Sequence, residues 1–240
     1  MDLGPRTSGA ALRGATVLVP LGAVEQHGAH LPLHTDSLVA RAVCDGVAER
    51  LADLPAVVAP TVEYGASGEH EGFPGTVSIG TDALLHLVVE LVRSARRWCG
   101  PVVLVTGHGG NAQALVHAVR QLRWEGHDVS WTSCAEPGWD AHAGRAETSM
   151  VLALDPASVR TEAAAPGPTR PVGELLARLR AEGVAAVSPS GVLGDPRGAS
   201  AAEGRAHLEQ LVERVARQVR AAAVDEDGCL VRPQGSGVPA

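Results

Sequence analysis

The chain runs VLVPLGAVEQHGAHLPLHTD from Val17 to Asp36, and this stretch predicts both the fold class and the position of a site. Residues 17–19 are continuously apolar and a glycine follows at Gly22, which is typical of a short buried strand. Acids and histidines come directly after it: Glu25, His27, His30, His34 and Asp36. Unpaired charge beside a buried strand is costly without a cation, so the cluster favours a metal site.

A structural interpretation of the same stretch is also open. Thr35 or Asp36 could cap the helix that follows, Glu25 could be solvated, and the histidines could be ordinary loop residues. A single acid or histidine would favour that interpretation, whereas the cluster favours metal binding. A mixed set of imidazole and carboxylate ligands suits zinc, manganese or ferrous iron.

Length and composition predict one compact domain. The chain has 240 residues, of which 45% are hydrophobic and 20% charged, enough for one well-buried core and few for two. We therefore expect a single domain over residues 1–240. Its ends, 1–13 and 226–240, are rich in glycine, proline and small polar residues, so we expect flexible tails there.

Charge and residue usage exclude several classes of protein. The net charge of −7 and the lack of a basic patch argue against a nucleic-acid partner. All basic residues are arginine, which excludes a lysine Schiff base or a P-loop lysine. No apolar run is long enough to cross a bilayer, and no signal pattern opens the chain, so no membrane association is expected. The four cysteines show no CxxC pairing, and we expect a cytoplasmic protein with free thiols.

Strand and helix patterns alternate along the chain, which predicts an α/β fold with a mostly parallel sheet. We expect strands at 17–19, 57–59, 101–106 and 129–133. We expect helices at 37–51, 82–97, 111–124, 147–154, 174–180 and 201–223. Acids or imidazoles follow three of the strands, in residues 25–36, 107–111 and 139–149. The carboxyl ends of parallel strands lie at one edge of a sheet, so these groups should converge there.

The polar motifs also match a known family, in order. They are EQHG (25–28) with LPLHTD (31–36), FPGT (73–76) after Glu69-His70, TGHGGN (106–111), and HAGRAETS (142–149). Together they resemble the creatininase family of metal-dependent amide hydrolases, over residues 17 to about 205. The loops 64–70 and 191–199 are similar to those of the family's mycofactocin-system branch, whose members trim a precursor peptide.

This resemblance implies a three-layer α/β/α fold and two adjacent divalent ions, zinc, Fe(II) or manganese. The ligands it implies are Glu25, His27, Asp36, His108 and Glu147, with Asp36 bridging the ions. An activated water would attack the amide carbonyl. His142 would protonate the leaving amine, or alternatively orient a ligand from behind it.

The branch resemblance further implies a substrate, the modified precursor peptide, from which a C-terminal Val-Tyr dipeptide is released. Candidate substrate contacts are Glu69, His70, Trp139 and Arg145, with Arg197 as a second possible anchor for a carboxylate. Gly110 stands where the creatinine-hydrolysing branch has an acid, which argues against creatinine. Family resemblance also implies a homo-oligomer, often a hexamer.

Several alternatives to a peptidase stay open at this point. A hydrolase of a small cyclic amide or formamide is the nearest, and a metal-stabilised scaffold without catalysis is another. The segment 107–110 could be only a tight turn, Glu69 and His70 could lie on a mobile loop, and Trp139 could be a lid or a subunit contact. A serine hydrolase lacks support, because no GxSxG elbow follows a strand.

Overall fold

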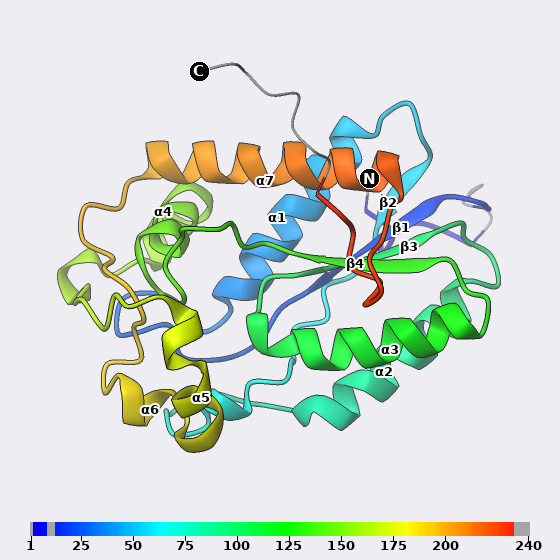
Figure 1. Cartoon of the computed structure of the whole chain (residues 1–240). Coiled ribbons are helices and arrows are strands. Elements are labelled where there is room, and N and C mark those ends of the chain that lie inside the picture. Colours follow the sequence, from blue (N-terminus) through cyan, green and yellow to red (C-terminus); the bar gives the residue numbers. More distant parts are fainter. Residues whose placement is uncertain (1, 9–12, 233–240) are drawn as a thin grey trace, which may run out of the picture.

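A four-stranded parallel sheet forms the centre of the computed structural model, which describes residues 2–8 and 13–232 (Figure 1). Its strand order is β2-β1-β3-β4, and each neighbouring pair is parallel. The strands are β1 (Thr16–Leu21), β2 (Ala56–Val58), β3 (Val102–Thr106) and β4 (Val129–Ser133). The predicted α/β fold with a parallel sheet is confirmed.

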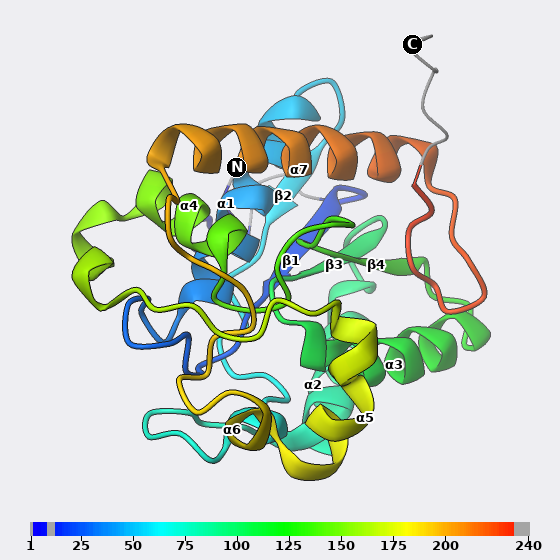
Figure 2. The same cartoon turned by 60° about the vertical axis from the view of Figure 1, so that its left-hand side comes forward.

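Helices cover both faces of this sheet, which makes the fold a three-layer α/β/α sandwich (Figures 1 and 2). One face carries α2 (Gly80–Ala95) and α3 (Ala112–Trp124). The other carries α1 (Thr35–Arg50), α4 (Arg145–Leu154) and α7 (Ala201–Ala221). The short helices α5 (Val172–Glu182) and α6 (Val184–Val187) pack beside a 3₁₀ turn at Gly68–His70.

The continuous apolar run of β1 follows from its burial on both faces. Val17, Val19 and Leu21 pack on the side of α2 and α3. Leu18 packs on the side of α1 and α7, because successive side chains of a strand point to opposite faces. A strand covered on both sides has no solvent face, so its sequence does not alternate between apolar and polar residues.

The three chemistry-bearing junctions meet at one edge of the sheet. In the register of the sheet, Leu21 of β1 pairs with Thr106 of β3, and Thr106 pairs with Ser133 of β4. The chain then leaves each strand in the same direction toward α1, α3 and α4. The convergence that the sequence predicts is therefore present.

The two ends of the chain contact the sheet where the structure describes them. The Leu3 amide donates to the Val58 carbonyl at 2.8 Å, and the Leu230 amide donates to the Trp131 carbonyl at 2.8 Å. Leu230 is buried, because it packs in the core on the side of α7. The prediction of a flexible tail from residue 226 did not anticipate this contact. Its remaining part, 233–240, and positions 1 and 9–12 of the other tail lie outside the described residues.

The helices within residues 2–8 and 13–232 are too short or too polar to span a membrane: none combines the length and the hydrophobicity that crossing a bilayer requires.

Candidate metal centre

Asp36 lies at the middle of the polar cluster and divides it into two halves. It stands in the first turn of α1, with its side chain buried. Its Oδ1 is 3.2 Å from His27 Nε2, and its Oδ2 is 3.8 Å from His108 Nδ1. The two oxygens of one carboxylate thus face two different imidazoles.

The first half of the cluster consists of His27, Asp36 and Glu147. His27 Nε2 is 4.0 Å from Glu147 Oε2, and Glu147 belongs to the first turn of α4. The Ala143 amide donates to the same Glu147 oxygen at 2.5 Å. Ala143 has a φ of 51°, so the turn before α4 is held in a left-handed conformation that aims this amide at the carboxylate.

The second half consists of Glu25, Asp36 and His108, with two more histidines around Glu25. Glu25 Oε1 is 3.2 Å from His108 Nδ1, 3.3 Å from His70 Nε2 and 3.7 Å from His142 Nδ1. Glu25 is 0% exposed. One buried carboxylate is therefore surrounded by three imidazoles.

Buried oxygens without hydrogen-bond partners show that these residues fit a metal. Both carboxylate oxygens of Glu25 and Oδ2 of Asp36 lack a hydrogen-bond partner. Leaving a buried carboxylate oxygen unpaired is costly, and a cation removes that cost. Among the residues that the structure describes, ligand atoms within 4.8 Å of one another occur in three sets: Glu25, His27 and Asp36; Glu25, His70 and His142; His27, His142 and Glu147. Imidazole and carboxylate donors suit zinc, manganese or ferrous iron.

The pKa values of the imidazoles that face Asp36 respond to the same negative charge. Burial alone lowers the pKa of His27, but Asp36, Glu147 and Glu25 together raise it to about 9. Burial likewise lowers the pKa of His108, and Glu25 and Asp36 outweigh it and raise the value to about 10. Both rings therefore favour the protonated, cationic form beside these carboxylates.

The remaining ionisable groups of the cluster shift in other directions. Burial, with the neighbouring cationic rings, lowers the pKa of His70 to about 4 and places that of His142 well below its usual value. Burial raises the pKa of Glu147 to about 7 despite His27. For Glu25 burial acts upward, but the three histidines around it hold its pKa well below the usual range.

Of the predicted substrate contacts, His70 and Glu69 lie at the cluster. Glu69 Oε1 is 3.5 Å from His108 Nε2, on the side of that ring that faces away from Glu25 and Asp36. A Cβ at Gly110 would come within 2.5 Å of the same Glu69 oxygen and 2.3 Å of His108 Nε2. The glycine at position 110 therefore leaves room for the Glu69 carboxylate beside His108.

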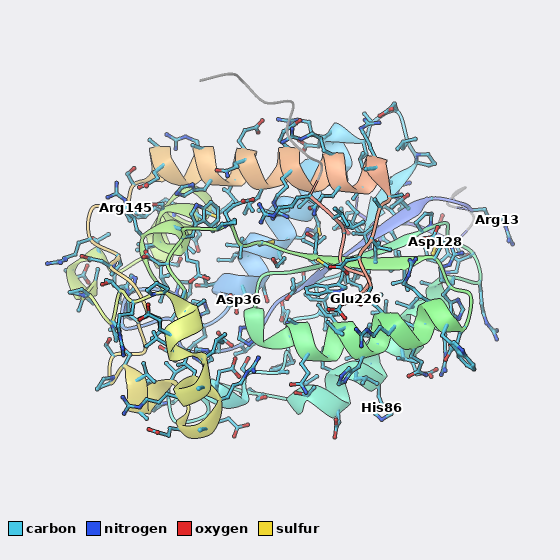
Figure 3. All side chains as sticks on the ribbon, viewed as in Figure 1. Arg13, Asp36, His86, Asp128, Arg145 and Glu226 are labelled. Atoms are coloured by element: carbon cyan, nitrogen blue, oxygen red, sulfur yellow. The ribbon has the colours of Figure 1, made fainter. Side chains whose placement is uncertain are left out.

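Trp139, Arg145 and Arg197 have their own partners elsewhere. The ring of Trp139 lies 4.5 Å from that of His207, between centroids, and lines a cavity of about 320 Å³ beside Leu193. Arg145 pairs with Glu203 at 2.9 Å, and Figure 3 shows it at the periphery, away from Asp36. Arg197 pairs with Asp195 at 2.7 Å. Both arginines are more than half exposed in their side chains.

Two buried amides at the site were not selected from the sequence. Asn111 donates to the Gly22 carbonyl at 3.0 Å and accepts from the Ala66 amide at 2.9 Å, so it joins the loops after β1 and β3 to the loop before His70. Gln26 contacts both His70 and His142 through its side chain. Their places inside the motifs EQHG and TGHGGN were the only signal available in the sequence.

Comparison with known proteins places this site in a family. A family model described as creatinine amidohydrolase matches residues 5–219. The chain belongs to the creatininase family. This match confirms the family resemblance of the four motifs. It also shows that the chain belongs to a family of hydrolases.

Two curated relatives show where in the family the chain lies. It is 52% identical over 217 residues to the mycofactocin precursor peptide peptidase of Mycolicibacterium smegmatis, an alignment that covers 89% of this chain and 88% of that protein. It is 32% identical over 239 residues to the creatinine amidohydrolase of Pseudomonas putida, with 85% and 88% covered. This creatininase-family chain is thus more similar to the first relative than to the second.

Solved structures of creatininases share the fold, and two of them are described by the metal they hold. A crystal structure of creatinine amidohydrolase (creatininase) matches with a TM-score of 0.71 at 30% identity, over 86% of this chain and 90% of that one. A variant creatininase described as Zn-Zn type matches with a TM-score of 0.70 at 29% identity, and a structure described as creatininase Mn matches with a TM-score of 0.69 at 30% identity. Both alignments cover 86% of this chain and 90% of the other. The creatininase-like fold is confirmed, and the polar cluster of this family member is a possible metal-binding group.

Proposed function

We propose that this protein is a metal-dependent peptidase that releases the C-terminal Val-Tyr dipeptide from the modified mycofactocin precursor peptide. The peptide substrate is supported by 52% identity, over 89% of the chain, to a mycofactocin precursor peptide peptidase. The observation that carries the metal-dependent chemistry is the buried Asp36 carboxylate, which faces His27 with one oxygen and His108 with the other.

In this proposal two divalent ions occupy the two halves of the cluster. His27 and Glu147 would hold one ion, Glu25 and His108 the other, and Asp36 both. When bound, the ions would lower the pKa of a water molecule and polarise the scissile carbonyl. Five side chains do not complete the coordination of two such ions, so positions remain for water and substrate.

His142 is the proposed proton carrier. Its lowered pKa leaves it neutral near pH 7, and its Nδ1 lies on the side of Glu25, 3.7 Å from Oε1. A neutral imidazole takes the proton from the attacking water and then gives it to the leaving amine, so that the amide bond breaks without releasing an amide anion.

The contacts with the peptide and the assembly of the protein are part of the same proposal. His70 and Glu69 lie at the cluster and are proposed to contact the peptide near the scissile bond, and Trp139 lines the cavity beside Leu193 that a peptide side chain could enter. Arg145 would reach a terminal carboxylate only after leaving Glu203. We further propose a cytoplasmic homo-oligomer, in keeping with four cysteines that are free thiols.

Mass spectrometry of the reaction products tests this function. The modified precursor peptide and, separately, creatinine are incubated with protein loaded with zinc, manganese or ferrous iron. We expect release of Val-Tyr that a chelator stops and added metal restores. Creatinine turnover without peptide cleavage would instead assign the small cyclic amide, and consumption of neither under any metal would contradict the peptidase function.

A further inference from the structure

The side-chain amide of Gln26 has a fixed orientation between two main-chain groups. The Gly28 amide donates to Gln26 Oε1 at 2.9 Å, and Gln26 Nε2 donates to the Gly191 carbonyl at 3.1 Å. An amide N–H can only donate and a carbonyl oxygen can only accept, so these two groups distinguish the oxygen of Gln26 from its nitrogen. Gln26 is buried, so water does not replace either partner.

This orientation determines which nitrogen of His70 carries its proton. Gln26 Nε2 lies 2.8 Å from His70 Nδ1 and has two hydrogens, one of which goes to Gly191. His70 Nδ1 at 2.8 Å and His142 Nε2 at 3.0 Å are both within reach of the other hydrogen. Because the Gln26 NH2 group cannot accept, a proton on His70 Nδ1 would leave two donors facing each other at 2.8 Å, so His70 Nδ1 accepts. The proton of a neutral His70 is therefore on Nε2, which faces Glu25 Oε1 at 3.3 Å.

The main-chain carbonyl of Gln26 determines the tautomer of His142 in the same way. His142 Nε2 is 2.8 Å from the carbonyl oxygen of Gln26 and 3.0 Å from its Nε2. An unprotonated His142 Nε2 could accept from Gln26 Nε2, but its lone pair would then face the carbonyl lone pairs at the shorter distance of 2.8 Å, and the Gln26 hydrogens already have Gly191 and His70 as acceptors. With the proton on Nε2 the ring donates to the carbonyl, and Nδ1 keeps a free lone pair on the side of Glu25.

The loop around Gly191 is shaped to hold this amide. A Cβ at position 191 would lie 1.7 Å from Gln26 Oε1, and the φ of Gly191 is +81°. No other residue type fits both the space and the backbone conformation. Gly28 also has a positive φ, of 68°, which turns its amide back onto Gln26 Oε1.

We propose that Gln26 is a positioning residue: its side chain and its main-chain carbonyl hold His70 and His142 in the Nε2-protonated form, so that His142 presents an unprotonated Nδ1 to the site. The catalytic value of this arrangement rests on the proposed function. The tautomers themselves are a property of the folded chain and can be measured without substrate.

Nitrogen NMR of the histidine rings tests the proposal directly. Long-range ¹H–¹⁵N spectra of protein labelled in its histidine rings are recorded without metal and with zinc, and the signals are assigned with single histidine variants. We expect His70 and His142 to show the pattern of a neutral ring protonated on Nε2. A proton on Nδ1 of His142 in the metal-free protein would overturn the proposal.

The variant Gln26→Glu separates the two histidines. A carboxylate at position 26 only accepts, so we expect a proton to appear on His70 Nδ1, whereas His142 keeps its pattern because the main-chain carbonyl remains. The matched control is Gln121→Glu on the exposed side of α3, which should leave both patterns unchanged. An unchanged His70 pattern in folded Gln26→Glu would contradict the assignment.

A second variant and a kinetic readout distinguish positioning from folding. Gln26→Met keeps the length of the side chain and removes its polar atoms, so His70 should lose its single tautomer while the melting temperature shows whether the fold remains. With the loaded enzyme, kcat of Gln26→Glu should fall about tenfold with KM little changed. If the wild-type protein shows the expected tautomers but releases no dipeptide, the proposed function is contradicted, whereas the positioning role of Gln26 is still supported.

Discussion

The two halves of the cluster share Asp36 but differ in exposure and charge. The half around Glu25 is closed: this carboxylate is 0% exposed and lies among three histidines that hold its pKa low. The half around Glu147 is more open: this side chain is 22% exposed, although the partial burial of its carboxyl group still raises its pKa to about 7. If the proposed function holds, the closed half would keep its cation more firmly, and the open half would exchange its cation or admit substrate more readily.

Replacing the shared residue should affect both halves and have the largest effect. Asp36→Asn leaves one neutral oxygen where two charged oxygens faced His27 and His108, so we expect the variant to lose its bound metal. Because the metal would supply the activated water, we expect activity to fall by a factor of about a thousand or more. Elemental analysis and dipeptide release measure this. Asp45→Asn, on the same helix but paired only at the surface with Arg41, is the control and should keep both. Full activity in metal-free Asp36→Asn would contradict a metal-dependent site.

Replacing one acid in each half tests the difference between them. Glu25→Gln should weaken metal retention about a hundredfold and Glu147→Gln about tenfold, because the closed half relies on a fully buried charge and the open half on a partly solvated one. Competition with a chelator, followed by elemental analysis, gives both values. Equal losses in the two variants would show that burial does not distinguish the halves.

Proton release on metal binding should depend on pH in a definite direction. The pKa values of about 9 for His27 and about 10 for His108 mean that both rings are protonated near pH 7.5 without metal, and each must lose its proton to coordinate. Calorimetry in buffers of different ionisation heat should show release that shrinks as the pH passes 9 to 10. Release that does not change over that range would contradict the assignment of these protons.

The same shifts predict how the stability of the metal-free protein varies with pH. The raised pKa values of His27 and His108 stabilise the fold fully below their unfolded value of 6.5, and this contribution is lost as the pH rises through 9 and 10. Glu147 acts in the same direction, because its pKa rises from its usual value of 4.5 to about 7 in the folded protein. We expect the melting temperature of metal-free protein to fall between pH 7 and 10, and a rise over that interval would contradict these shifts.

The sequence predicted the part of the site that depends on strand ends. Parallel strands bring their carboxyl ends to one edge, so Glu25 after β1 and His108 after β3 could be placed together from periodicity alone. The role of Gln26 was not predicted, because it depends on Gly191, which is 165 positions away in the sequence. Arg145 was selected only because its forked guanidinium can bind a carboxylate, and its partner Glu203 comes from the packing of α7 on α4.

The smallest predicted effect concerns Glu69, at the outer side of the closed half. Its carboxylate is 30% exposed and 3.5 Å from His108 Nε2, a nitrogen that also lies 3.2 Å from the Ala66 carbonyl, so Glu69 is a second and partly solvated neighbour of that ring. We expect Glu69→Gln to lower activity only about threefold to tenfold and to leave bound metal nearly unchanged. Steady-state kinetics with elemental analysis measure this, and loss of metal comparable to that in Glu25→Gln would make Glu69 part of the metal site itself.

The central claim is that Asp36 joins two adjacent cation sites of unequal exposure. Anomalous diffraction from crystals of protein loaded with zinc, recorded on both sides of the zinc edge, tests it most directly. We expect two peaks, one between His27 and Glu147 and one between Glu25 and His108, with Asp36 between them and the lower occupancy at Glu147. A single peak, or a peak away from Asp36, would contradict it.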